Sequence, residues 1–145
     1  MIAWHYTTGQ KFLAIVESGY LKPTNIDVRP PEKPILWFSL NQKWENTANK
    51  AILEADGEIK RLSMQETRRL GGGLVRFGIK PNVLYLGNQL RIKASMSASI
   101  WKVLCKEGLK QNAKPSEWCG SLKPIPINKL FIEVMNKDFV WEKVS

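Results

Sequence analysis

Short apolar runs separated by turn residues constrain this chain more than any other feature. Residues 35–39 (ILWFS) and 74–79 (LVRFGI) have the length of buried strands. Similar strand-like runs lie at residues 2–6, 83–86, 117–121, 130–135 and 139–144. No apolar run approaches the roughly 20 residues that a membrane-spanning helix needs. The pattern therefore predicts many short strands and no span of a membrane.

Helix signals lie between these runs. Thr7 and Gln10 have the spacing of a capping box, and Gly19 is placed to end the following helix in the left-handed conformation. Asn41 is a suitable N-cap for a second helix, which would run through residues 44–52. These signals predict two helices in the first part of the chain.

Two later segments also carry helix signals. Ser63 and Glu66 form a second capping box, ahead of a short helix that would end before residues 71–73 (GGG). The glycines lack the lysine and the following helix of a phosphate-binding loop, so we interpret them as a turn. A further helix is expected over residues 97–106, with Gly108 as its stop. Early helices and late strands predict an α+β fold, and the length fits a single domain over residues 1–145.

The charge balance indicates an anionic partner. The chain has 22 Lys and Arg residues against 13 Asp and Glu residues, a net charge of +9. Such a surface attracts nucleic acid, a nucleotide cofactor or an anionic membrane, and a basic surface without a function is the alternative. Much of the charge lies in the middle of the chain, in Lys60, Arg61, Arg68, Arg69, Arg76, Lys80, Arg91 and Lys93.

Metal sites and secretion are not indicated. The chain contains two cysteines and one histidine, a set too small for a typical zinc site. The N-terminus (MIAWH) lacks the basic and apolar regions of a secretory signal. We therefore expect no metal, a cytoplasmic protein and free thiols, which a reducing cytosol favours.

Two titratable residues are candidates for chemistry. His5 lies in the first expected strand beside Tyr6 and Thr7, where an imidazole could bind a sugar hydroxyl next to an aromatic ring. The alternative is a histidine satisfied by a nearby carbonyl. Glu117 begins a late strand-like run, where its carboxylate could stabilise a developing cation. The alternative for Glu117 is an ordinary charge on an edge strand.

The segments around these residues resemble three motifs of the ADP-ribosyltransferase superfamily. The first is WHYT at residues 4–7 with a helix ending in SGYLKP at 18–23, and the second is LWFS at 36–39. The third is SEWCGS at 116–121 followed by IPINKLFIEV at 125–134. The likeness is closest to the small bacterial branch that includes DNA-modifying toxins and RNA 2′-phosphotransferases. The resemblance implies ADP-ribosyltransferase-like split antiparallel β-sheets with short flanking helices.

The resemblance also implies that NAD is the cofactor and that the first two motifs bind it. His5 would bind a ribose hydroxyl, Thr7 the nicotinamide amide, and Ser39 the nicotinamide end. The residues implied to contact NAD are His5, Tyr6, Thr7, Trp37, Phe38 and Ser39. An arginine, one of Arg68, Arg69 and Arg76, would pair with the diphosphate.

Glu117 and His5 are the implied catalytic residues. Glu117 would stabilise the oxocarbenium-like ribose as nicotinamide leaves, and deleting one such preorganised group typically costs about 10²–10³ in rate. The acceptor would be a nucleic acid or a protein, and transfer, hydrolysis and phosphate removal remain open as outcomes. A non-catalytic, basic nucleic-acid-binding module is the alternative function. The enzymatic hypothesis requires the side chains of His5, Ser39 and Glu117 to line one cleft.

Overall fold

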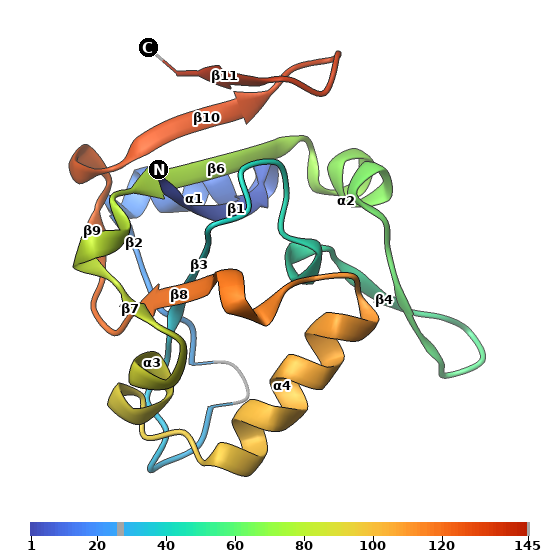
Figure 1. Cartoon of the computed structure of the whole chain (residues 1–145). Helices are drawn as coiled ribbons and strands as arrows, with labels where there is room; N and C mark the ends of the chain where they lie inside the picture. Colours follow the sequence, from blue (N-terminus) through green and yellow to red (C-terminus); the bar gives the residue numbers. More distant parts are fainter. Residues whose placement is uncertain (26–27, 145) are drawn as a thin grey trace.

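The computed structural model describes residues 1–25 and 28–144. Within them, the main sheet has seven strands in the order β11-β10-β6-β1-β3-β8-β7, and neighbouring strands pair antiparallel. Figure 1 shows α1 and α2 beside the β1–β6 half of this sheet and α3 and α4 beside the β8 half. The α+β class predicted from the sequence is therefore confirmed.

The strands are short, as the apolar runs predict. Those of the main sheet are β1 (Ala3–Thr8), β3 (Leu36–Ser39), β6 (Leu74–Ile79), β7 (Tyr85–Leu86), β8 (Trp118–Ser121), β10 (Phe131–Met135) and β11 (Trp141–Lys143). Two smaller pairs are β2 (Tyr20–Leu21) with β9 (Ile125–Pro126), and β4 (Ala51–Leu53) with β5 (Ile59–Arg61). The β4–β5 hairpin projects away from the body of the molecule (Figure 1).

The helices are α1 (Gly9–Ser18), α2 (Met64–Gly71), α3 (Gly87–Lys93) and α4 (Ala98–Lys110), with 3₁₀ turns η1 (Asn46–Ala48), η2 (Pro81–Val83), η3 (Pro115–Glu117) and η4 (Ile127–Lys129). The Ser63–Glu66 capping box is confirmed, and Gly19 ends α1 with φ of 79°. The Thr7–Gln10 box is wrong, because Thr8 is the N-cap of α1 and makes no side-chain cap bond. No helix of the described ranges is long and apolar enough to cross a membrane.

Two further helix predictions are corrected by tertiary contacts. Residues 44–52 do not form a helix: Glu45 caps the 3₁₀ turn η1, and the chain then enters β4. Helix α4 does not stop at Gly108 but continues to Lys110. A Cβ at Gly108 would lie 2.5 Å from a ring carbon of Trp118, so this glycine lets the indole lie directly against the helix.

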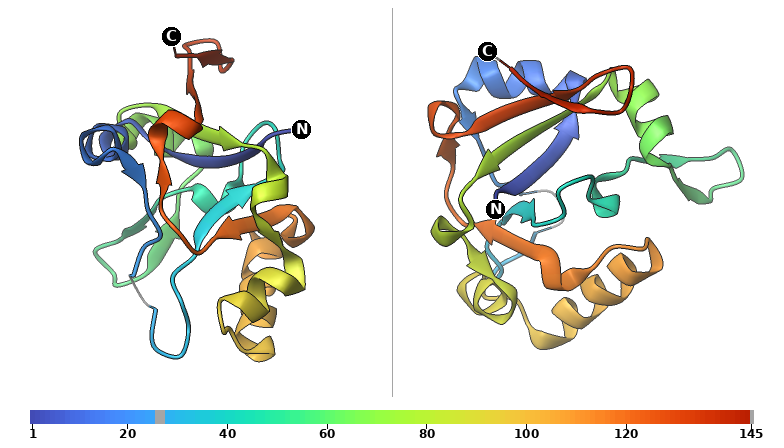
Figure 2. Two further views of the ribbon diagram at one scale, coloured as in Figure 1. Left: turned by 90° about the vertical axis from the view of Figure 1, so that its left-hand side faces the viewer. Right: turned by 45° about the horizontal axis from the view of Figure 1, so that its top comes forward.

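The junction between β1 and β3 is the feature that positions the site. Strand β1 pairs with β6 over its full length, whereas it pairs with β3 at one residue pair, Trp4 with Ser39. The sheet is therefore loosely joined in its centre. Figure 2 shows β1 and β3 in two further views, with β8 on the far side of β3 from β1. One face of the junction packs on a core that includes Phe38, Phe77 and Cys119.

Candidate functional site

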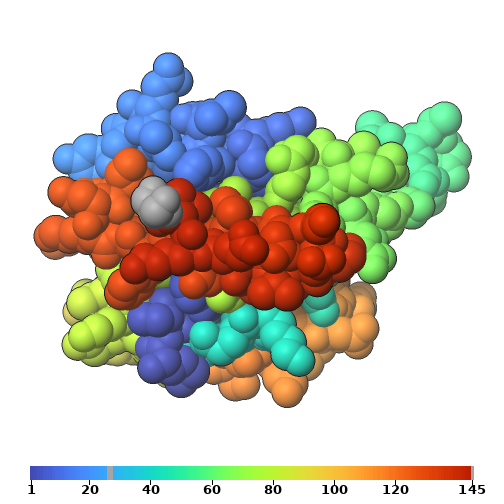
Figure 3. Space-filling view, turned by 90° about the horizontal axis from the view of Figure 1, so that it is seen from above, coloured from blue at the N-terminus to red at the C-terminus, as the bar shows by residue number. Residues whose placement is uncertain are grey.

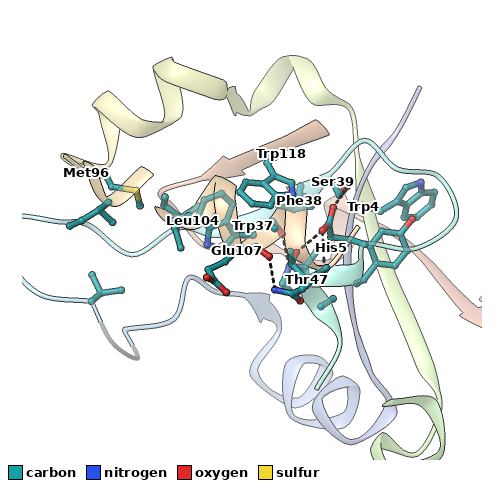
Figure 4. A pocket seen from close by; sticks show the side chains of 18 of the residues that line it. Trp4, His5, Trp37, Phe38, Ser39, Thr47, Met96, Leu104, Glu107 and Trp118 are labelled. Carbon is teal, nitrogen blue, oxygen red and sulfur yellow. Dashed lines mark hydrogen bonds between the residues drawn. The ribbon is translucent and has the colours of Figure 1, made fainter. Parts of the chain in front are cut away.

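A cavity of about 630 Å³ lies at this junction. Its walls come from β1, β3, the segment that follows β3, β8 and α4. In Figure 4 the aromatic side chains gather around its middle, while Met96 and Trp4 lie at opposite ends of the view. The volume is within the range of about 300–1,000 Å³ that is usual for small-molecule sites.

Most of the residues that the sequence analysis singled out meet here. The cavity is lined by His5, Tyr6, Trp37, Phe38 and Ser39. The remaining two predicted residues, Thr7 and Glu117, are not among its lining residues. Thr7 is buried within the sheet, opposite Val75 of β6.

The expectation that Glu117 joins His5 and Ser39 in one cleft is not met. Glu117 ends the turn η3, and its backbone carbonyl accepts a hydrogen bond of 2.9 Å from the N–H of Leu40. The next residue, Trp118, pairs with Ser39 and takes the cavity-lining position. Neighbouring residues at the start of a strand tend to point to opposite faces of the sheet, which explains why Trp118 lines the cavity and Glu117 does not. One carboxyl oxygen of Glu117 is buried without a hydrogen-bond partner in the described part of the chain.

A different carboxyl group, that of Glu45, lines the cavity. Its Oε1 accepts a hydrogen bond of 2.9 Å from Ser39 Oγ. Its Oε2 accepts from the backbone N–H of Thr47 at 3.1 Å and from Thr47 Oγ1 at 2.6 Å. Glu45 is 8% exposed, and it forms no salt bridge within the described residues. Three neutral donors thus hold an acidic group that has no cationic partner, which is unusual for a buried charge.

Glu45 was not among the predicted site residues, because residues 44–52 carry helix signals. Glutamate is also not among the preferred N-cap residues, so the sequence did not indicate that Glu45 would cap a turn. Nothing in the sequence indicated that Ser39, from the preceding strand, would donate to the same carboxyl group.

His5 is held as a neutral imidazole. Its Nδ1 lies 2.7 Å from the carbonyl oxygen of Trp37, and because a carbonyl only accepts, Nδ1 carries the hydrogen. Burial lowers the pKa of His5, an effect opposed by this hydrogen bond and reinforced by the charge of Lys11. The contact matches the alternative interpretation of a histidine satisfied by a carbonyl. It also leaves Nε2 with a free lone pair, so a cavity ligand could donate to it.

The remaining walls are aromatic, with a few polar atoms. Trp37 and Trp118 meet edge to face with ring centroids 5.9 Å apart. The buried indole N–H of Trp118 and a side-chain oxygen of Gln111 have no hydrogen-bond partner in the described ranges. The cationic side chains that line the cavity are Lys33 and Arg61.

Arg68, Arg69 and Arg76, the sequence-based candidates for a diphosphate partner, lie elsewhere. None of the three lines the cavity. Arg68 donates to the carbonyl of Asn136, and Arg76 forms a salt bridge with Glu133. Both bonds bind the C-terminal hairpin β10–β11 to the rest of the molecule.

Comparison with known proteins identifies no family and no function for this chain. No protein-family model matches the chain, and neither a curated protein nor a solved structure matches it. The described residues contain no cluster of three or more His, Cys, Asp or Glu side chains that could hold a metal ion. Both cysteines are free thiols.

Proposed function

We propose that the chain is an ADP-ribosyltransferase-like enzyme that uses NAD to modify a macromolecule. The observation that carries this proposal is the Glu45 carboxyl group, which lines the same aromatic cavity as His5 and has no cationic partner among the described residues. The first two sequence motifs support the same reaction, because His5 and Ser39 line this cavity; the third does not, because its Glu117 is not among the lining residues. In this proposal Glu45 takes the role that the motif resemblance gave to Glu117.

The loosely joined sheet supports the finer fold assignment. The single residue pair between β1 and β3 separates a β11-β10-β6-β1 part from a β3-β8-β7 part. We interpret these parts as the split antiparallel sheets that the resemblance implies. The cavity is lined by residues of both parts, so a ligand would lie across the division.

The residues present fit a dinucleotide that ends in a flat ring. Trp37 and Trp118 offer aromatic surface for the ring, and His5 Nε2 would accept a hydrogen bond from a ribose hydroxyl. Arg61 and Lys33 would pair with the diphosphate. Each of these residues lines the cavity.

Glu45 supplies the chemistry that the reaction needs most. When the bond between ribose and nicotinamide breaks, the electron pair leaves with the nicotinamide nitrogen and positive charge develops on the sugar carbon. A fixed negative group aimed at that carbon stabilises the charge without having to reorganise. The acceptor then forms a bond to the same carbon and releases its proton to solvent. Ser39 and Thr47 hold the Glu45 carboxyl group in place throughout.

Nicotinamide release from radiolabelled NAD tests the proposal directly. The purified chain is incubated with NAD alone and with DNA, RNA or cell extract. We expect Glu45→Gln to lower the rate by about 10²–10³-fold. Glu117→Gln and Glu107→Gln should stay near wild type, the latter because Glu107 lines the cavity but pairs with Lys110. An equal loss in all three variants, or no release by the wild type, would refute the proposed role of Glu45.

The net charge of +9 supports a second candidate, a non-catalytic nucleic-acid-binding module. This candidate predicts affinity for nucleic acid that falls steeply with salt, together with no nicotinamide release. NAD itself separates the two candidates. At a concentration of about 100 times Kd it would stabilise the fold by about 2.7 kcal/mol. For 145 residues this raises Tm by roughly 9 °C, whereas a module without an NAD site would melt unchanged.

A further inference from the structure

The segment that carries Glu45 is held by side chains from three separate strands. Residues 40–45 connect β3 to η1 without regular structure. The carbonyl of Asn41 accepts from Tyr6 Oη at 2.5 Å, and that of Gln42 accepts from Arg76 Nη1 at 2.6 Å. The carbonyl of Lys43 accepts from Trp141 Nε1 at 2.9 Å. Three consecutive carbonyls thus receive side-chain donors from β1, β6 and β11, and we call these three bonds the loop clamp.

The clamp donors are themselves fixed. Arg76 is 7% exposed, and its guanidinium lies between the rings of Trp4 (3.8 Å) and Trp141 (4.5 Å). Glu133 of β10 accepts two further bonds from the same guanidinium. Tyr6 packs edge to face on Trp44, one residue before Glu45. Packing therefore fixes the donors Tyr6 and Arg76, whose bonds are partly buried, whereas the bond from Trp141 to Lys43 is exposed.

The segment in turn orders the carboxyl group. The N–H of Asn41 donates to Ser39 Oγ at 3.1 Å, and the same hydroxyl donates to Glu45 Oε1. A shift of the segment would therefore move both Glu45 and the hydroxyl that orients it. In Figure 3 the C-terminal hairpin runs across this face, with the teal residues of the segment beside it. The hairpin contributes one clamp donor directly, through Trp141, and supports a second through the Glu133–Arg76 pair.

We propose that Arg76 and Trp141 are positioning residues for the Glu45 carboxyl group, so that the C-terminal hairpin sets the geometry of a site whose cavity it does not line. This inference rests on the proposed function. Neither residue touches the cavity, so neither should contribute to ligand binding. Loss of a clamp bond should lower kcat and leave KM and the NAD-induced rise in Tm nearly unchanged.

Trp141→Phe is the sharpest variant, because it keeps an aromatic ring beside Arg76 and removes the N–H that reaches Lys43. We expect kcat for nicotinamide release to fall at least tenfold, since a displacement of about 1 Å can cost about 10²-fold in rate. Phe139→Leu is the matched control, because Phe139 lies in the same hairpin but packs on Arg68. Arg76→Lys is the second variant, and it should likewise lower kcat while leaving KM nearly unchanged.

Amide hydrogen exchange at Thr47 provides a readout that does not need activity, because this N–H is bonded to Glu45 Oε2. Trp141→Phe should speed its exchange, whereas Phe139→Leu should not. If the exchange rate of the Thr47 N–H is unchanged in Trp141→Phe, the loop clamp does not order the segment and the proposal is wrong. Faster exchange with an unchanged kcat overturns the positioning role. If the wild type releases no nicotinamide, the proposed function fails, and with it the catalytic purpose of the clamp. The exchange result then still shows whether the hairpin fixes the segment.

Discussion

Replacing Arg76 by methionine should destabilise the protein strongly without touching the cavity. The guanidinium donates two hydrogen bonds to Glu133 and one to the carbonyl of Gln42. It also lies against Trp4 and Trp141. Methionine fills much of the space of the arginine stem but offers none of these donors, so the substitution isolates the polar contribution.

The magnitude follows from these contacts. Removing one partner of a buried ion pair costs about 3–5 kcal/mol, mostly because the other charge is left unpaired. The side chain of Glu133 is 24% exposed, which places the ion-pair loss at the lower end of that range. Two cation–π contacts add about 0.5–1 kcal/mol each, for a total of about 4 kcal/mol. With an unfolding entropy of about 2.1 cal/mol/K per residue over 145 residues, Tm should fall by roughly 13 °C.

Urea unfolding of the wild type, Arg76→Met, Glu133→Met and the double variant measures this directly. The double variant should be at least about 1.5 kcal/mol more stable than Arg76→Met, because it no longer buries an unpaired carboxyl group. A cost below about 1 kcal/mol for Arg76→Met, or a double variant no more stable than the single one, would refute the reasoning. Had Arg76 bound the diphosphate, as the sequence analysis allowed, the loss would instead appear in NAD affinity with an unchanged Tm.

Three further predictions concern the cavity and its neighbours. Trp118→Phe removes an indole N–H that has no partner among the described residues, and it also deletes ring carbons that lie against Gly108, so stability should fall by about 1–3 kcal/mol; NAD affinity, from melting curves at increasing NAD, should fall about tenfold, and unchanged affinity would exclude the N–H as a ligand contact. The pKa of His5 is lowered in the folded protein, so as the pH falls His5 is protonated in the unfolded chain before it is protonated in the folded one. The free energy of unfolding should therefore decrease below about pH 6.5, by up to 1.4 kcal/mol per pH unit. In thermal unfolding between pH 5 and about 7.5, the stability of His5→Asn should depend less on pH than that of the wild type. An equal pH dependence in the two proteins would contradict this prediction. Burial raises the pKa of Tyr6 to about 12, so absorbance titration of the wild type minus Tyr6→Phe should show a phenol that ionises only near that pH.

Local sequence patterns predicted the helices and strands that depend on interactions between residues close together in the sequence. The runs at 35–39 and 74–79 became β3 and β6, and Ser63 and Glu66 cap α2 as their spacing required. Gly72 and Gly73 form the expected turn with positive φ, whereas Gly71, which was expected in the turn, is still the last residue of α2. Capping boxes and buried strands depend on neighbours along the chain, and for that reason their patterns can be recognised without a fold.

Contacts between distant residues decided the rest. The segment after Asn41 has helix signals, but side-chain donors from Tyr6, Arg76 and Trp141 satisfy its carbonyls without a helix. Gly108 looked like a helix stop, yet it is the point where Trp118 lies against α4.

The amino-acid sequence alone determined the α+β class and the basic charge, and the motif resemblance implied the grouping of His5 with residues 37–39 that the cavity shows. The tertiary structure placed Glu45, and not Glu117, among the carboxyl groups that line the cavity. The physical reason is that the position of a carboxyl group depends on its hydrogen-bond donors and on the face of the sheet toward which its side chain points. Ser39 at the end of β3 reaches Glu45 because the connecting residues 40–45 turn back toward the end of that strand before η1 begins.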